Sequence, residues 1–466
     1  MSNIICGTLR KKKKFYFSFD RDSKILTIQP AKMEKFSSLF TEFDFEKYSY
    51  LRDKIDIDGE TNSGTYIRFI EVKFSSIGRG CFQAWVPAYI IGRSYGVSPV
   101  AKPNLIKNIS FKGECIDRFM SSKCTVTDKW DRDNSKLELK VDYGKDKIKS
   151  FNYNNLTFKL IPGWNMTTVH KDVNNVLTMQ TSLVINSEKN LNIKSIINIY
   201  KDVEKLFSFI CYRQHVKFDS IILTQTEPVL HGNTPQDTTI NFELFVSSDD
   251  EKYDLPKIGK NMILTDYIDK IPLLLSCIKN NEFMLLSFPN NSLMESIIDN
   301  NKYINISSAF ESEFDLLNPK FKSNRKKYYN DAKVFTLNYL KNQKNNRKKY
   351  NSQIRNYFND LYSFVDNCEG RLEEQIDYTL KKYDYIVEPD RKYYESKYPN
   401  IDFSNYSLAK SFSNKRNYLS HGSKLDRFKT LEIASYTIIR KLNYAMILDR
   451  AGFSNDQIMK IINNIL

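Results

Sequence analysis

The chain has 466 residues and a mass of 54.8 kDa, a length that predicts two domains. Its hydrophobic share of 41%, with only 15 glycines and 13 prolines, excludes a low-complexity or disordered chain. No apolar run approaches the roughly 20 residues that cross a bilayer. The apolar residues of the amino terminus precede its lysines rather than follow them, unlike those of a secretory signal. We therefore expect a cytoplasmic protein without a membrane-spanning segment.

The charge and the cysteines bear on partners and cofactors. A net charge of +15 favours a polyanionic partner, although the general richness of the chain in Lys, Asn, Ile and Tyr would raise the charge without one. The seven cysteines are an odd number, scattered, and without a C-x-x-C pair. No glycine-rich phosphate loop is present either. We expect reduced thiols, no bound metal and no cofactor.

Up to about residue 250 the dominant pattern is alternation of apolar and polar residues in short runs, which predicts antiparallel strands. The predicted strands cover residues 14–20, 24–30, 66–74, 136–144, 155–162, 176–185 and 239–248. Residues 192–210 are the exception, because Ile196, Ile199, Val203, Leu206 and Phe207 recur at helical spacing.

From about residue 262 the pattern becomes helical. In the carboxy-terminal part, helices are predicted over 338–368 (one or two), 369–385, 404–421 and 427–450, with a last one opening at the capping box of Ser454 and Gln457. Pro389 is predicted to break the chain between two of them. The result is an α+β protein, with a β-rich amino-terminal domain over 1–310 and an all-α bundle over 311–466.

One predicted helix, 404–421, separates apolar from polar residues. At about 100° per residue, Leu408, Phe412 and Leu419 fall on one stripe of this helix. Asn417 and His421, four residues apart, are neighbours on the opposite face. Gly422 follows, as expected for a residue that ends a helix.

Arg416 and Ser420 extend that polar face, and with Asn417 and His421 they suit a phosphate. An arginine offers a planar, permanent charge to phosphate oxygens, and a histidine exchanges a proton near neutral pH. The plainer interpretation is a histidine at the end of a helix, where the helix dipole stabilises its protonated form. The presence of Arg416 and Asn417 beside His421 favours the catalytic one.

The string R-N-Y-L-S-H over 416–421, followed by Gly422, resembles the R-N-x-x-x-H signature of HEPN ribonucleases. The segments at 6–8, 23–30, 89–96 and 109–120 also resemble the amino-terminal domain of the Apea-like HEPN proteins, which act in anti-phage abortive infection. The segment 448–462 behind the motif fits the same family.

The resemblance implies metal-independent RNA cleavage, in which the 2′-hydroxyl of the RNA attacks the adjacent phosphate. His421 would act as base or acid, Arg416 would hold the developing charge, and Asn417 would position the phosphate or orient His421. The resemblance further implies a homodimer formed through the helical domain, a structured host RNA such as tRNA as target, and a phage-encoded trigger that the amino-terminal domain senses.

The segment 322–349 carries ten basic residues against one acidic residue, interleaved with aromatics. Such a mixture can bind single-stranded RNA, although many charge runs are only solvated helix faces. The candidate RNA contacts are Lys326, Lys327, Lys348, Lys349 and, immediately before the motif, Lys415.

Two other interpretations remain open for the whole chain. One is a catalytically silent HEPN module that binds RNA or a protein partner, against which the complete set of Arg416, Asn417 and His421 argues. The other is a DNA-binding regulator, for which no basic recognition helix is visible. The similar string from Arg355 to Asp360 has Asp in place of the histidine, and we interpret it as a helix surface.

Overall fold

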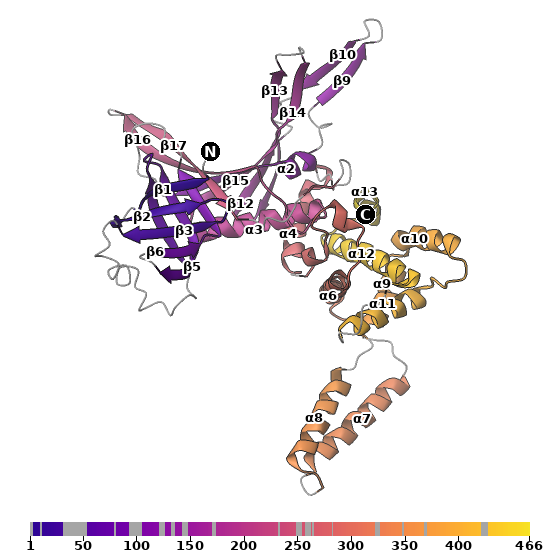
Figure 1. The fold of residues 1–466 in the computed structure, drawn as a ribbon. Helices are drawn as coiled ribbons and strands as arrows, with labels where there is room; N and C mark the ends of the chain where they lie inside the picture. Colours follow the sequence, from indigo (N-terminus) through magenta and orange to yellow (C-terminus); the bar gives the residue numbers. More distant parts are fainter. Residues whose placement is uncertain are drawn as a thin grey trace. The chain divides into compact units, whose positions relative to one another are not determined.

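The structure is a computed structural model, and its elements are drawn in Figure 1. It describes residues 3–9, 12–30, 54–78, 81–92, 105–120, 126–131, 136–141, 148–169, 174–231, 234–247, 254–256, 262, 265–281, 283–321, 327–346, 349–367, 371–420 and 427–466. The chain forms two compact units. The β-rich unit comprises Met1–Cys211 and His215–Pro272, and the helical unit comprises Tyr212–Gln214 and Leu273–Leu466.

The β-rich unit has strands at six of the seven predicted strand segments, the exception being 176–185, and it has further strands. Its strands are β1 (Ile4–Leu9), β2 (Lys12–Asp20), β3 (Ile25–Pro30), β4 (Ile55–Thr61), β5 (Tyr66–Gly78), β6 (Cys81–Trp85), β7 (Ala88–Gly92), β8 (Ile106–Lys112), β9 (Val126–Asp131), β10 (Lys136–Val141), β11 (Lys149–Tyr153), β12 (Leu156–Ile161), β13 (Trp164–Val169), β14 (Asn174–Met179), β15 (Ser182–Leu191), β16 (Ser220–His231) and β17 (Thr234–Val246). Its helices are α2 (Glu114–Phe119), α3 (Ile193–Ile210) and the 3₁₀ turn η4 (Thr265–Lys270).

Most of these strands form one antiparallel sheet, in the order β11-β12-β15-β8-β16-β17-β7-β5-β4-β1-β2-β3-β6. Strand β6 also pairs with β5, so the strands β5, β4, β1, β2, β3 and β6 close into a ring. Inward-facing phenylalanines fill this ring, among them Phe15, Phe17, Phe19 and Phe69. The alternation in the sequence places them there, because successive side chains of a strand point to opposite faces.

Helix α3 covers another part of the sheet. Asn192 caps its first turn, since the Asn192 Oδ1 accepts a hydrogen bond from the Ser195 backbone N–H at 2.8 Å. The predicted apolar face is buried, and its Phe207 packs edge-on against Phe218, which in turn packs against Phe111 of β8. The prediction of this helix is confirmed.

Asp117 on α2 is a partly buried carboxylate that accepts a hydrogen bond from the backbone N–H of Thr181. Burial raises the pKa of Asp117 from 3.8 to about 6, and Asp219 acts in the same direction. The folded state therefore binds more protons than the unfolded state between about pH 4 and pH 6, and the free energy of unfolding falls as pH rises through that window.

We expect this fall to be about 1–2 kcal/mol for a partly exposed group. Urea unfolding of the wild type and of Asp117→Asn, at about pH 4 and about pH 7, measures it. The variant has no titrating group at position 117. Its free energy of unfolding, compared with that of the wild type, should therefore increase from about pH 4 to about pH 7. A constant difference would contradict the expectation.

The helical unit contains α4 (Ile271–Lys279), η5 (Leu285–Ser287), α5 (Ser292–Glu295), α6 (Asn300–Leu317), α7 (Lys327–Asn345), α8 (Ser352–Asn367), α9 (Arg371–Lys382), α10 (Asp384–Lys397), α11 (Asn405–Ser420), α12 (Thr430–Arg450) and α13 (Asn455–Ile465). Helices α6, α9, α11 and α12 contact one another. The chain is thus an α+β protein with a β-rich amino-terminal part and a helical carboxy-terminal part, as predicted.

The boundary between the units differs from the predicted one at 310. The helical unit begins at Leu273, because α6 packs against α11 and α12. It also takes Tyr212, Arg213 and Gln214 from the middle of the β-rich sequence. The side chains of Tyr212 and Arg213 are fully buried, and the Tyr212 ring lies 4.4 Å from that of Phe288.

Two local predictions were wrong. Residues 176–185 form parts of two strands in different sheets, β14 and β15, which Gln180 and Thr181 separate. Pro389 lies inside α10 instead of breaking the helical run. The break comes earlier, at Tyr383, whose φ of −109° and ψ of 31° end α9 before α10 starts.

Candidate active site

Helix α11 carries the R-N-Y-L-S-H string. The Ser404 hydroxyl caps its amino terminus by accepting a hydrogen bond from the Ser407 backbone N–H at 3.3 Å. Leu408 and Phe412 are buried, as the predicted apolar stripe requires, and the Phe412 ring stacks on Tyr303 of α6 with centroids 4.6 Å apart. Leu419 is half-buried. This packing fixes which side of α11 faces solvent.

Arg416 and Asn417 lie together near the end of α11. Arg416 Nη1 donates a hydrogen bond to Asn417 Oδ1 at 3.3 Å, and the Ser420 hydroxyl donates to the Arg416 carbonyl at 2.9 Å. Asn417 and Ser420 are exposed, and Arg416 is half-buried. His421 follows α11 directly and lies outside the described residues. The described part of the predicted site is therefore brought together on a solvent-facing surface.

Glu311 on α6 joins this pair, and its contact with Arg416 was not predicted from the sequence. Arg416 Nη2 lies 3.2 Å from Glu311 Oε1, which also accepts a hydrogen bond from the Ser307 hydroxyl at 3.1 Å. The side chains of Arg416 and Glu311 are 34% and 36% exposed, so solvent reaches both partners. The one available signal was the spacing of Ser307 and Glu311, which puts them on one face of a helix. Their partner lies far along the sequence.

Lys415 is buried, in contrast to its assignment as an RNA contact. Its side chain is 5% exposed, and Nζ lies 3.3 Å from Glu432 Oε2. The ring of Phe428 lies 4.8 Å from the same Nζ. Glu432 also accepts the backbone N–H of Lys429 at 2.8 Å, at the start of α12. Lys415 thus ties α11 to the first turn of α12, and its ammonium group does not face solvent.

The other candidate RNA contacts belong to the basic segment. Lys326 and Lys348 lie outside the described residues, and Lys327 is the first residue of α7. Lys349 is exposed, with Nζ 5.3 Å from the centroid of the Tyr350 ring. Arg355, of the similar R-N string, lies on α8 and donates to the Asn351 carbonyl at 3.4 Å, which agrees with a helix surface.

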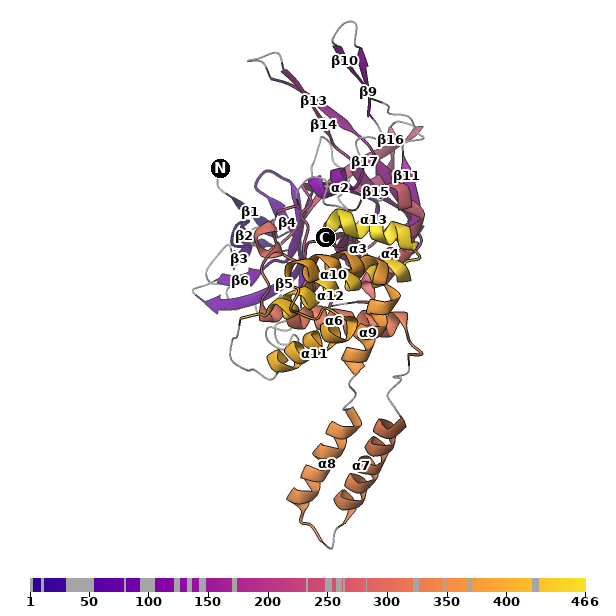
Figure 2. The same cartoon turned by 90° about the vertical axis from the view of Figure 1, so that its right-hand side faces the viewer.

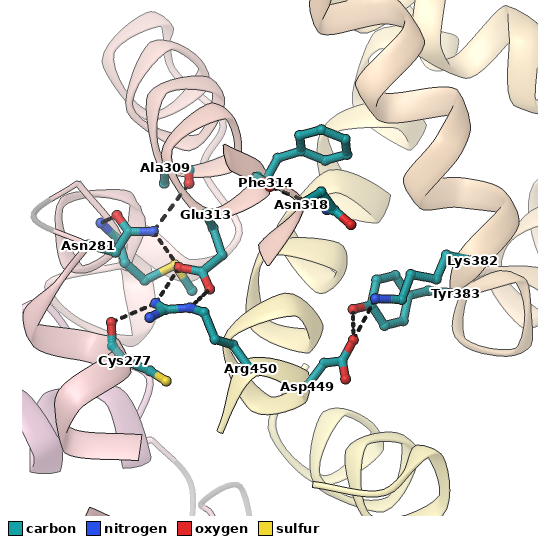
Figure 3. A network of polar contacts seen from close by, with 11 residues as sticks. Cys277, Asn281, Ala309, Glu313, Phe314, Asn318, Lys382, Tyr383, Asp449 and Arg450 are labelled. Atoms are coloured by element: carbon teal, nitrogen blue, oxygen red, sulfur yellow. Dashed lines mark hydrogen bonds and ion pairs between the residues drawn. The ribbon is translucent and has the colours of Figure 1, made fainter. Parts of the chain in front are cut away.

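An ion pair between Glu313 and Arg450 holds α6, the helix that carries Glu311, against α12 (Figure 3). Glu313 is fully buried and accepts hydrogen bonds from Arg450 of α12 at 2.6 and 2.8 Å. Asn281 donates to the same carboxylate at 3.1 Å, and Arg450 also donates to the Cys277 carbonyl at 2.8 Å. Since Glu311 is two residues from Glu313, the rigid frame around Glu313 also fixes the backbone that presents Glu311 to Arg416.

Within the described ranges, no three His, Cys, Asp or Glu side chains gather in an arrangement that could bind a metal ion. None of the described helices is both long and apolar enough to span a bilayer. Comparison with protein families, curated proteins and solved structures finds no match to this chain.

Proposed function

We propose that the helical unit is an endoribonuclease of the HEPN type that needs no metal ion. The observation that carries the proposal is the contact between Arg416 and Asn417 on the exposed end of α11, immediately before His421. Arg416 supplies a two-pronged positive charge for phosphate oxygens, and His421 supplies a group that exchanges protons near neutral pH. A silent adapter has no need of all three side chains.

The reaction follows from the chemistry of RNA. The 2′-hydroxyl gives its proton to a base, its oxygen forms a bond to the adjacent phosphorus, and the bond from phosphorus to the 5′-oxygen breaks while that oxygen takes up a proton. The products are a 2′,3′-cyclic phosphate and a 5′-hydroxyl. Arg416 stabilises the charge on the phosphoryl oxygens, and His421 transfers a proton. Asn417 positions the phosphate or orients His421.

A second copy of the chain completes this scheme. One step needs a base and the other an acid, and each chain has a single histidine in the motif. Two facing copies of α11 provide two imidazoles and two guanidinium groups in one cleft. We therefore propose a homodimer through the helical unit, with RNA, including tRNA, as substrate. The resemblance to abortive-infection proteins extends the proposal to anti-phage defence, with a phage-encoded trigger that the β-rich unit senses.

Glu311 is proposed as a positioning residue that holds the guanidinium of Arg416 in its working orientation. Glu311→Ala should lower kcat roughly 10-fold to 10²-fold, because misplacing a catalytic group is costly, while KM changes little. Glu311→Gln keeps an oxygen acceptor for Ser307 and Arg416, so it should retain most of the activity. For each variant, single-turnover cleavage measures the rate of the reaction, and a titration with RNA measures the dependence on RNA concentration. Equal losses in the two variants would contradict a role through hydrogen-bond geometry.

The test of the function is cleavage of total cellular RNA by the purified 466-residue chain, with and without EDTA. We expect cleavage to continue in EDTA and the fragments to end in a 2′,3′-cyclic phosphate or 3′-phosphate, because imidazole and guanidinium groups carry the chemistry. His421→Ala, purified identically, controls for contaminating nucleases. Fragments that end in 3′-hydroxyls, or loss of activity on chelation, would contradict the mechanism. An inert wild type that still binds RNA would favour the adapter.

A further inference from the structure

Helices α7 and α8 form an antiparallel hairpin within the helical unit (Figures 1 and 2). Leu340 is buried between them, and Lys344 of α7 donates to Asn359 of α8 at 3.2 Å. The Nζ of Lys344 also lies 4.5 Å from the centroid of the Tyr362 ring. These contacts involve one side of each helix, and the other side of each helix does not take part in them.

The remaining surface carries large apolar side chains in contact with solvent. On α8, Ile354, Tyr357 and Leu361 are exposed and recur at positions i, i+3 and i+7, which is one stripe of a helix. On α7, Phe335 and Tyr339 are exposed four residues apart. Phe335 is 74% exposed and Tyr357 is 71% exposed, so the contact between the two helices does not bury either side chain. Large exposed apolar side chains that gather on one pair of helices are typical of a binding surface.

Tyr339 of α7 and Tyr357 of α8 are 52% and 71% exposed, and the two helices that carry them contact each other. Exposed tyrosine rings on two neighbouring helices provide separate flat faces on which bases can stack.

The charge of the hairpin distinguishes between its conceivable occupants. Residues 327–367 contain eight basic and three acidic residues. A second copy of this surface would bring like charges together, whereas a polyanion is attracted to it. Aromatic rings surrounded by basic residues provide both interactions that unpaired RNA needs, stacking for the bases and positive charge for the phosphates.

We propose that the α7–α8 hairpin binds single-stranded RNA, with bases stacked on Tyr339, Tyr357 and Phe335 and phosphates near exposed lysines such as Lys341 and Lys349. The surface extends the proposed nuclease function by naming unpaired RNA as the form that is captured. Binding to it does not depend on cleavage.

The experiment measures fluorescence anisotropy of a labelled polyuridylate 20-mer with the full chain carrying His421→Ala, in EDTA. Tyr339→Ala/Tyr357→Ala should weaken binding at least about tenfold, because the loss of each stacked ring costs about fivefold or more, with an unchanged salt dependence. The matched control is Tyr393→Ala/Tyr406→Ala, which removes exposed tyrosines of α10 and α11 that also lie near lysines. This control should bind like the parent protein.

Two further measurements sharpen the result. Lys341→Gln/Lys349→Gln should lower the slope of log affinity against log salt by roughly 0.7 for each phosphate that a lysine no longer neutralises. A duplex RNA of the same length should bind without sensitivity to the tyrosines. Unchanged polyuridylate affinity in Tyr339→Ala/Tyr357→Ala would overturn the proposal. So would a loss of self-association in that variant, seen by light scattering, without a loss of RNA binding, since the patch would then join protein chains.

Because His421→Ala removes the proposed catalytic proton exchange, this experiment separates the two proposals. Failure of the nuclease assay leaves the binding result unaffected, and failure of binding to the hairpin leaves the cleavage chemistry at α11 standing.

Discussion

An Arg416→Ala variant is expected to cleave RNA roughly 10²- to 10³-fold more slowly than the wild type, as loss of one charge-stabilising donor typically does. His421→Ala should lose roughly 10²-fold or more through the missing proton transfer. Arg416 is half-exposed, and its ion pair with Glu311 reaches solvent, so its loss should change the free energy of unfolding by about 1 kcal/mol or less.

The matched control is Lys410→Ala, which removes an exposed positive charge earlier on α11. It should melt and cleave like the wild type. Mixing His421→Ala chains with wild-type chains should reduce activity beyond dilution if two copies build one cleft. An Arg416→Ala protein that melts normally and cleaves at the wild-type rate would refute the site, and one that melts far lower would make Arg416 a structural residue.

Glu313→Ala is expected to lower the free energy of unfolding of the helical unit by about 3 kcal/mol, because it leaves the Arg450 guanidinium, whose side chain is only 15% exposed, without its partner. The Glu313 carboxylate is fully buried and accepts hydrogen bonds from Nε and Nη2 of Arg450 and from the Asn281 amide. Urea unfolding followed by circular dichroism measures the loss.

The chain offers a close control two residues away on the same helix. Glu311→Ala removes a half-exposed carboxylate and should cost about 1 kcal/mol or less. The two glutamates are thus expected to have different roles: loss of Glu313 should lower stability, and loss of Glu311 should lower turnover. Similar melting temperatures for Glu311→Ala and Glu313→Ala would contradict the assignment of Glu313 as the buried anchor.

The sequence allowed the orientation of α11 to be predicted but not the partners of its polar face. The periodicity of Leu408 and Phe412 correctly separated the buried side from Asn417. The same arithmetic places Lys415 beside Phe412 on the buried stripe, and its assignment to RNA gave the charge more weight than the position. Burial of Lys415 depends on Glu432 of another helix, and the role of Glu311 depends on α6 packing beside α11. Neither of these interactions leaves a local pattern.

The fold shows the same division. Alternation predicted the strands around Phe17 and Phe69, since each strand buries one face, but it could not reveal that 176–185 changes sheet at Gln180 and Thr181. Pro389 was expected to end a helix because proline lacks a backbone donor. The packing of α10 retains the helix there, and the break falls at Tyr383, where nothing in the local sequence marks it.

The burial of Tyr212 and Arg213 limits how this protein can be divided. Their side chains complete the interior of the helical unit, yet they belong to a stretch whose flanking residues on both sides belong to the β-rich unit. No single cut in the chain releases an intact helical unit, because a fragment that starts at Leu273 lacks two large interior side chains. A single gene crossover at the codon for Leu273 would therefore separate Tyr212 and Arg213 from the interior that they complete.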